Sequence, residues 1–174
     1  MPSSVTEEDI KKLREARYLT AKVSHRLPAR GQVVPTPEPN ENVVFISHFL
    51  RGLGLTLDPF VRGLMFYYGL HFHDLAPDSF LHISAFIVVC EAFLRITPHF
   101  GLWLKTFDVK PKMVEGRHVA CGGALISKIA GAPWPKGPFP EVSGLWQREW
   151  FYITAPKSAK WVAAPAFRSG PPPQ

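Results

Sequence analysis

Three prolines constrain this chain more than any other feature, because each stands where a helix can begin but cannot continue. They occur in Asp58-Pro59, Ala76-Pro77 and Thr97-Pro98. Proline has no amide hydrogen to donate, so the first turn of a helix tolerates it and the interior does not. Gly69, a residue type that favours the left-handed end of a helix, separates the first two. The pattern predicts consecutive short helices over 59–68, 77–94 and 98–107, joined by tight turns.

Two more helices are expected on the N-terminal side of these three. Thr6 is followed by three acidic residues, which suits a helix over 7–17 that begins at a threonine cap. Asn42 can cap a further helix over 43–51. Between them, the segment 27–39 holds four prolines and is predicted to be a linker or a surface strap.

The composition of the chain changes after residue 108, and strands are expected there. Residues 117–129 are small and partly β-branched, and residues 146–154 alternate aromatic with polar side chains. Together they predict a small hairpin or two-stranded sheet packed on the helices. The fold class is therefore α+β and predominantly α-helical, with four to five short helices and a small C-terminal β-hairpin or sheet.

Three parts of the chain are distinguished by composition. Residues 1–40 are expected to hold an N-terminal helix and a proline-rich linker, and residues 41–155 a helical core with C-terminal strands. Residues 156–174, which end in GPPPQ, are expected to form a disordered tail.

Positive charge collects in the last third of the chain. Residues 108–174 carry nine basic and four acidic side chains, whereas residues 41–107 carry four basic and five acidic. Such an excess attracts polyanions weakly, and it is equally common on solvated surfaces. One alternative function is therefore binding of RNA or DNA, with these candidate contacts: Lys105, Lys110, Lys112 and Arg117.

The acidic residues of the core do not predict a catalytic site. A two-metal nuclease needs three carboxylates that converge. Asp58 and Asp78 are explained as helix caps, and Glu91 is expected to pair with Arg95 one helical turn further on. A metal-dependent nuclease or transposase is thus the least favoured function, and no catalytic residue is predicted.

His71 and His73 are the best candidates for a metal site. Alternate histidines in an extended segment place both rings on one side, although both also follow a helix end, where imidazole can bind free carbonyl groups. The chain has two cysteines, fewer than the three of a retroviral zinc knuckle. We predict no metal site and no cofactor.

The sequence gives no indication of export or of a membrane segment. The first residues are charged and lack an apolar stretch. The longest uncharged run of the core, Ser79–Cys90, has 12 residues, fewer than the ~20 that a span requires. We expect a buried helix there, and an intracellular chain, cytoplasmic or nuclear, with no membrane partner.

Residues 43–107, here called the core block, resemble a known family, the gypsy-type transposon domain of plant retrotransposon open reading frames, also named transposase of gypsy type. The matching segments are 43–55 (VVFISHFLRGLGL), 59–79 (PFVRGLMFYYGLHFHDLAPDS), 86–107 (FIVVCEAFLRITPHFGLWLKTF) and 146–153 (WQREWFYI). The resemblance covers roughly residues 5–155 and departs over 111–145. It implies a protein from the Gag end of a retroelement, or a domesticated or remnant host copy, and it implies no reaction.

The preferred hypothesis is a non-enzymatic, Gag-like structural domain that acts by protein–protein contact and self-associates. The core block holds more aromatic residues than one small core can bury, so some are expected on the surface. The candidate surface residues are Phe66, Tyr67, Phe100 and Trp103.

Overall fold

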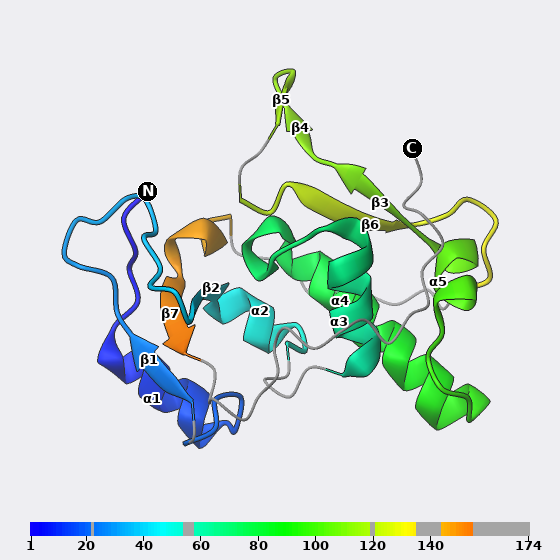
Figure 1. Cartoon of the computed structure of the whole chain (residues 1–174), viewed down its shortest axis with the longest axis horizontal. Coiled ribbons are helices and arrows are strands. Elements are labelled where there is room, and N and C mark those ends of the chain that lie inside the picture. Colours follow the sequence, from blue (N-terminus) through cyan, green and yellow to red (C-terminus); the bar gives the residue numbers. More distant parts are fainter. Residues whose placement is uncertain (22, 54–57, 119–120, 135–143, 155–174) are drawn as a thin grey trace.

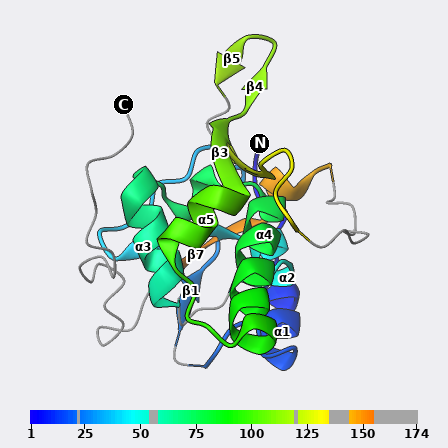
Figure 2. The same ribbon diagram turned by 90° about the vertical axis from the view of Figure 1, so that its right-hand side faces the viewer.

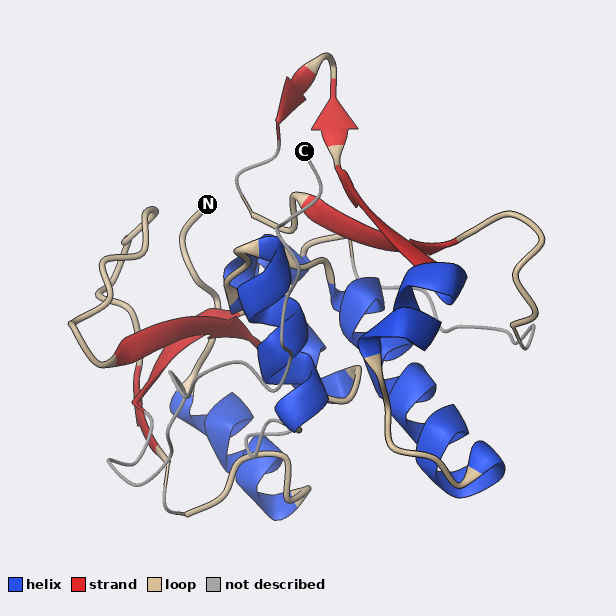
Figure 3. Cartoon of the chain, turned by 45° about the vertical axis from the view of Figure 1, so that its right-hand side comes forward, coloured by secondary structure: helices blue, strands red, loops and turns tan. Residues whose placement is uncertain are grey.

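The computed structural model describes residues 1–21, 23–53, 58–118, 121–134 and 144–154. A three-stranded sheet lies at one side of the molecule, a long two-stranded ribbon lies at the other, and most of the helices lie between them (Figure 1). Figure 3 shows the same alternation of strand and helix. The expected α+β fold is confirmed.

Strand β7 (Trp150–Thr154) forms the centre of the three-stranded sheet. It pairs antiparallel with β1 (Ser24–Arg26) on one side and with β2 (Glu41–Phe45) on the other. Its first four residues are buried, so both faces of the strand are covered. The beginning and the end of the described chain are therefore joined in one sheet.

The segment 43–51 was expected to be one helix, and this prediction is wrong for its first half. Val43–Phe45 belong to β2, and only α2 (Ile46–Leu50) is helical. Two adjacent valines and a phenylalanine suit a strand once a partner is available, and β7 supplies that partner from more than 100 residues away. Asn42 accordingly caps no helix.

The helices predicted after Thr6 and after Asp58 both form, although the first ends two residues earlier than predicted. Helix α1 (Glu7–Glu15) begins with a capping box, in which the Thr6 side chain accepts from the Asp9 amide and the Asp9 side chain accepts from the Thr6 amide. Helix α3 (Pro59–Tyr68) begins at Asp58, which accepts from the Phe60 amide at 2.7 Å. It ends at Gly69 in the left-handed conformation.

The helix expected over 77–94 is confirmed as one continuous element with two kinds of turn. Helix α4 (Pro77–Val88) is followed directly by η2 (Val89–Leu94), which has the wider π-helical turn. Helix α5 (Phe100–Thr106) begins later than predicted, because His99 rather than Thr97 caps it by accepting from the Leu102 amide.

The strand expected over 117–129 is divided and pairs differently from the prediction. Strand β6 (Ala124–Lys128) pairs antiparallel with β3 (Phe107–Pro111) and not with β7. The ribbon continues into a hairpin of β4 (Met113–Val114) and β5 (Arg117–His118), which projects from the molecule (Figures 1 and 2). Two short 3-10 turns complete the described elements, η1 (Phe72–Asp74) and η3 (Trp146–Arg148).

Helix α4 fastens the ribbon to the rest of the core. Ser79 is buried in its first turn, donates to the Ala124 carbonyl oxygen at 3.2 Å and accepts from the Ile126 amide at 3.1 Å. Both partners lie on β6, so one hydroxyl group joins helix and strand. The largest fully buried side chains are aromatic: Trp103, Trp150, Tyr152, Phe49, Phe86, Phe107 and Phe151.

A histidine with no exposed surface lies at the junction of α2, α4 and η3. The His48 ring is 4.4 Å from the Phe80 ring and 5.9 Å from the Trp146 ring. Its Nε2 lies 3.1 Å from the Leu75 carbonyl oxygen and donates to it. Burial lowers the pKa of His48 to about 3, so the ring is neutral at physiological pH.

Replacement of Gly122 by alanine should destabilise the protein. Gly122 has a positive φ of 68°, and an added Cβ would lie 2.6 Å from the Trp146 ring. The loss should combine ~1 kcal/mol of backbone strain with ~1–3 kcal/mol from overpacking. Gly116→Ala is the matched control, because φ is 74° there and the added Cβ meets nothing within 4 Å. Equal midpoints of urea unfolding for the two variants would contradict the packing argument.

As the pH falls, the free energy of unfolding should decrease more steeply in the wild type than in His48→Gln. The folded pKa of about 3 lies below the ordinary value of 6.5, so between these values the unfolded chain binds more protons. The contribution of His48 is therefore complete above pH 6.5 and is lost as the pH falls below it, by about 1.4 kcal/mol per pH unit. Urea unfolding at several pH values measures both slopes. His82, whose pKa burial also lowers, contributes equally to both proteins, and parallel slopes would refute the assignment to His48.

Candidate functional site

The helix made of α4 and η2 is buried along its first part and exposed at its end. Phe80, Ile83 and Phe86 lie in the core, and Cys90 is also buried, but the larger apolar side chains at the end of the helix are exposed. Phe93 is 76% exposed. We name this end the helix tip and define it by four exposed residues: Val88, Phe93, Leu94 and Ile96.

A left-handed residue in the backbone ends the helix at the helix tip. Arg95 takes up a left-handed conformation with a φ of 55°, and the Ile96 amide then donates to the Cys90 carbonyl oxygen at 2.9 Å. The helix stops there, and the chain turns back towards α5. In Figures 1 and 3 this end extends away from the sheet, on the side where α5 lies.

By length and composition alone, this helix could cross a membrane. It spans 18 residues, Pro77–Leu94, with a mean hydropathy of 1.4, and 33% of that window is buried. Its first part is nevertheless a core helix, since Ser79 is bonded to β6 and Ser84 Oγ donates to the Gly52 carbonyl oxygen at 3.2 Å. The exposed apolar surface is concentrated in its second half.

Two opposite charges flank the apolar tip. Glu91 and Arg95 are both exposed, and no ion pair joins either of them to a described residue. The expected pair between them does not form. Arg95 has left the helix through its positive φ, so it no longer lies one turn above Glu91 on the same face.

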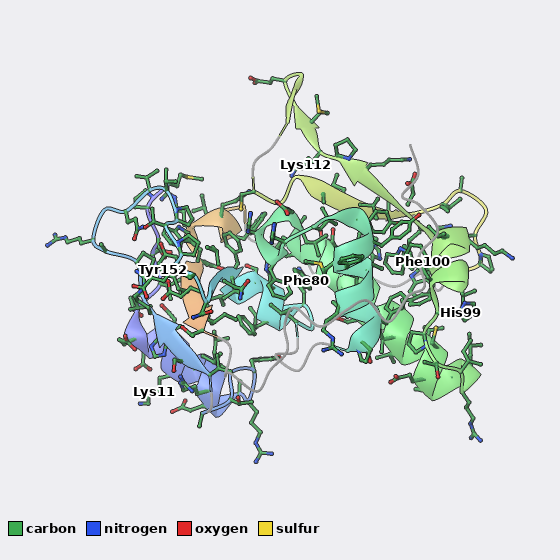
Figure 4. All side chains as sticks on the ribbon, in the orientation of Figure 1. Lys11, Phe80, His99, Phe100, Lys112 and Tyr152 are labelled. Carbon is green, nitrogen blue, oxygen red and sulfur yellow. The ribbon has the colours of Figure 1, made fainter. Side chains whose placement is uncertain are left out.

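The four aromatic residues expected on the surface have different positions. Phe66 is 62% exposed, whereas Tyr67 and Phe100 are half-buried and contact each other, with ring centroids 4.2 Å apart and the ring planes tilted by 57°. Figure 4 shows Phe100 beside the other side chains of this end of the molecule. Trp103 is fully buried against Phe86 and Phe107, so it cannot belong to a surface.

The basic candidates come from separate elements of the fold. Lys105 is exposed on α5, and Lys112 is half-buried between β3 and β4 (Figure 4). Lys110 is exposed on β3, but its Nζ lies 3.0 Å from a carboxylate oxygen of Asp108. The side chain of Arg117 lies outside the described part of the structure. Of the three described lysines, Lys110 is therefore paired with an acid of its own strand, and Lys105 and Lys112 lie on different elements.

Apart from Glu91, the acidic residues between Asp58 and Asp78 are engaged in local contacts. Asp58 caps α3, and Asp74 accepts from the His71 amide at 2.6 Å. One carboxylate oxygen of Asp78 lies 3.9 Å from an Arg51 guanidinium nitrogen. Each carboxylate thus serves the element on which it lies or that element's neighbour.

The histidine pair lacks further ligands among the described residues. The rings of His71 and His73 are parallel, with centroids 5.5 Å apart. Within the described ranges, no group of three or more histidine, cysteine or acidic side chains is placed to hold a metal ion.

Burial, with the nearby Asp74 charge, raises the pKa of the Cys121 thiol to about 11, so it remains protonated at neutral pH.

Sequence reasoning missed the helix tip, although the sequence carries a signal for it. The run from Phe86 to Leu94 has one charged residue and no polar stripe. A helix that is apolar on all sides has to be covered on all sides, and a chain of this size offers little to cover it. The expectation of a wholly buried helix holds for its first part only.

One comparison with known proteins gives a match. A family model described as putative gypsy type transposon matches residues 43–111, from the middle of β2 to the end of β3. No curated protein and no solved structure matches the chain. The match covers the helical core and the helix tip, and it confirms the resemblance over this segment. Over residues 43–111 the chain is therefore similar to the gypsy-type transposon family.

Proposed function

We propose that this chain is a non-enzymatic, Gag-like structural domain of a plant gypsy-type retrotransposon protein, or a host copy of one. Its activity is self-association through the helix tip. The observation that carries the proposal is the exposure of Phe93 and its apolar neighbours at the end of an otherwise buried helix.

The chemistry of the helix tip favours a protein partner. Three of its four residues, Val88, Leu94 and Ile96, are aliphatic, and the fourth is an aromatic ring with most of its surface in water. Burial of apolar surface is favourable by about 25 cal/mol per Å², and contiguous exposed apolar patches mark interaction sites. The patch therefore gains free energy when another surface covers it.

The two flanking charges favour a second copy of the same chain. In a twofold dimer each residue meets its counterpart reciprocally, so Glu91 of one copy can face Arg95 of the other, and the reverse pair forms at once. Neither side chain is in an ion pair with a described residue of its own chain, so no existing bond has to break. An identical copy thus supplies both the apolar cover and the complementary charges.

A contact of this size should be weak. Stable dimers usually bury more than about 1,200 Å² in total, and four side chains with their neighbours supply less than that. We therefore expect a concentration-dependent equilibrium of monomer and dimer. Attachment of several copies to one assembly would strengthen it by raising the effective concentration.

Substitution of Phe93 should abolish self-association and leave the fold intact. Phe93→Ser removes the aromatic ring of the helix tip, which is 76% exposed and does not belong to the hydrophobic core. Sedimentation equilibrium of the full chain should show a dimer in the wild type and a monomer in the variant, with unchanged circular dichroism. Phe66→Ser is the matched control, because Phe66 is 62% exposed on another helix. A wild type that stays monomeric at high concentration contradicts the proposal, and loss of the dimer only in Phe66→Ser moves the surface to α3.

Exchange of the flanking charges should weaken the dimer singly and restore it in combination. Glu91→Arg places like charges opposite each other in its homodimer, and Arg95→Glu does the same with the opposite sign. Each should raise the dissociation constant by about tenfold, since two exposed pairs contribute ~0.4–2 kcal/mol together. An equimolar mixture of the two variants should form a mixed dimer with both pairs attractive. If mixing has no effect, the twofold pairing is wrong. If the chain stays monomeric and its helix tip binds neutral phospholipid vesicles instead, self-association is wrong.

A further inference from the structure

Four side chains hold the proline-rich loop 27–40 against the three-stranded sheet, and we name them the clasp: Arg26, Gln32, Glu41 and Tyr152. Arg26 on β1 lies over the Tyr152 ring of β7, with 3.9 Å between the guanidinium carbon and the ring centroid, and it binds both carboxylate oxygens of Glu41 on β2. From the loop, Gln32 Nε2 donates to the Tyr152 hydroxyl at 2.9 Å. Figure 4 labels Tyr152 at this side of the molecule. The loop has no helix or strand, yet side chains from all three strands hold it.

Thr36 lies in this loop, and three of its polar atoms form hydrogen bonds with residues of the clasp. The Thr36 amide donates to the Tyr152 hydroxyl at 2.9 Å, and its carbonyl oxygen accepts from Arg26 at 3.4 Å. Its hydroxyl oxygen accepts from Gln32 Nε2 at 2.9 Å. The residue is nevertheless exposed. Prolines on both sides, Pro35 and Pro37, bias the segment to extended backbone.

The full sequence has two places where a serine or threonine precedes a proline, Thr36-Pro37 and Thr97-Pro98. Both threonines are exposed, but the two prolines differ. Pro37 is exposed, whereas Pro98 is buried. An enzyme that requires proline after its target residue has to contact the proline ring, so it can read the first pair in the folded protein and not the second.

We propose that Thr36 is a phosphorylation site for a proline-directed protein kinase. In the transfer, the Thr36 hydroxyl oxygen forms a bond to the γ-phosphorus of ATP, the bond from that phosphorus to the bridging oxygen breaks, and ADP leaves. The hydroxyl proton passes to the catalytic base of the kinase. Thr36 is displayed in an extended, proline-flanked segment, which is the form in which such enzymes bind their substrates.

The phosphate would act on the clasp itself. It adds about −1.5 to −2 charges at neutral pH beside Arg26, the cation of the clasp. Arg26 is already bound to Glu41, whose side chain is 7% exposed. The Arg26 guanidinium and a hydrogen bond hold the pKa of Glu41 below its ordinary value, so this carboxylate depends on Arg26. A phosphate on Thr36 competes for the same guanidinium and should loosen the loop.

The test treats the full chain with a proline-directed kinase and magnesium ATP and locates the phosphate by peptide mass spectrometry. We expect one phosphoryl group, on Thr36. Pro37→Ala, which keeps the Thr36 hydroxyl, and Thr36→Val should each abolish the transfer. Thr97 is the internal control and should stay unmodified in the folded protein, and should become a substrate when the chain is unfolded in urea and diluted.

Three results would overturn the assignment. A kinase that modifies a standard threonine-proline peptide but leaves Thr36 unmodified shows that the clasp hides the hydroxyl group. Equal modification of Thr97 in the folded protein removes the argument from the exposed proline. Transfer to Thr36 in Pro37→Ala removes the requirement for proline.

The effect on the clasp has its own measurement. The Glu38 amide donates to a Glu41 carboxylate oxygen at 2.9 Å, so its hydrogen exchange reports whether Glu41 stays in place. Exchange at Glu38 should become several-fold faster after phosphorylation, while the Leu102 amide, which donates to His99 at the start of α5, keeps its rate. An unchanged rate at Glu38 would show that the phosphate leaves the clasp intact.

Discussion

The pairing of β7 with both β1 and β2 is the interaction on which the rest of this molecule depends. Alternate residues of β7 serve two hydrophobic clusters: Phe151 and Ile153 pack into the larger one with the helices, and Trp150 and Tyr152 into the smaller one on the other face. The strand is therefore covered on both faces and bonded at both edges. Without it, β1 and β2 have no common neighbour in the described structure.

The two surfaces proposed for function relate to this sheet in opposite ways. The clasp around Thr36 lies directly on it, since Arg26, Tyr152 and Glu41 come one from each strand. The helix tip lies beyond the packed half of α4, and its four residues are 40–76% exposed. The clasp is thus held in place by the sheet, whereas the helix tip belongs to a helix outside the sheet. A change at the first need not disturb contacts made at the second.

The sequence predicted the local features of the fold and missed those that depend on distant residues. Asp58 and Gly69 define α3 through atoms within a few residues, and both were predicted correctly. Val43 and Val44 were misassigned because their partner strand begins at Trp150. Trp103 was expected on the surface because of the number of aromatic residues, but that number does not show which of them face the core. The pairing of Lys110 with Asp108 could have been found, since residues two apart on a strand point to the same side.

The central position of β7 also determines when the fold can form. A chain emerging from the ribosome presents β1 and β2 long before Trp150–Thr154 has been synthesised. During that interval each of these strands has unpaired amide and carbonyl groups along its edge, which can bond to a strand from another nascent chain. Polysomes that make this protein therefore hold many copies in which the place of β7 is empty. Strand β7 of one chain could pair with β1 and β2 of its neighbour, and exchange of β7 between adjacent nascent chains would produce dimers joined through the sheet.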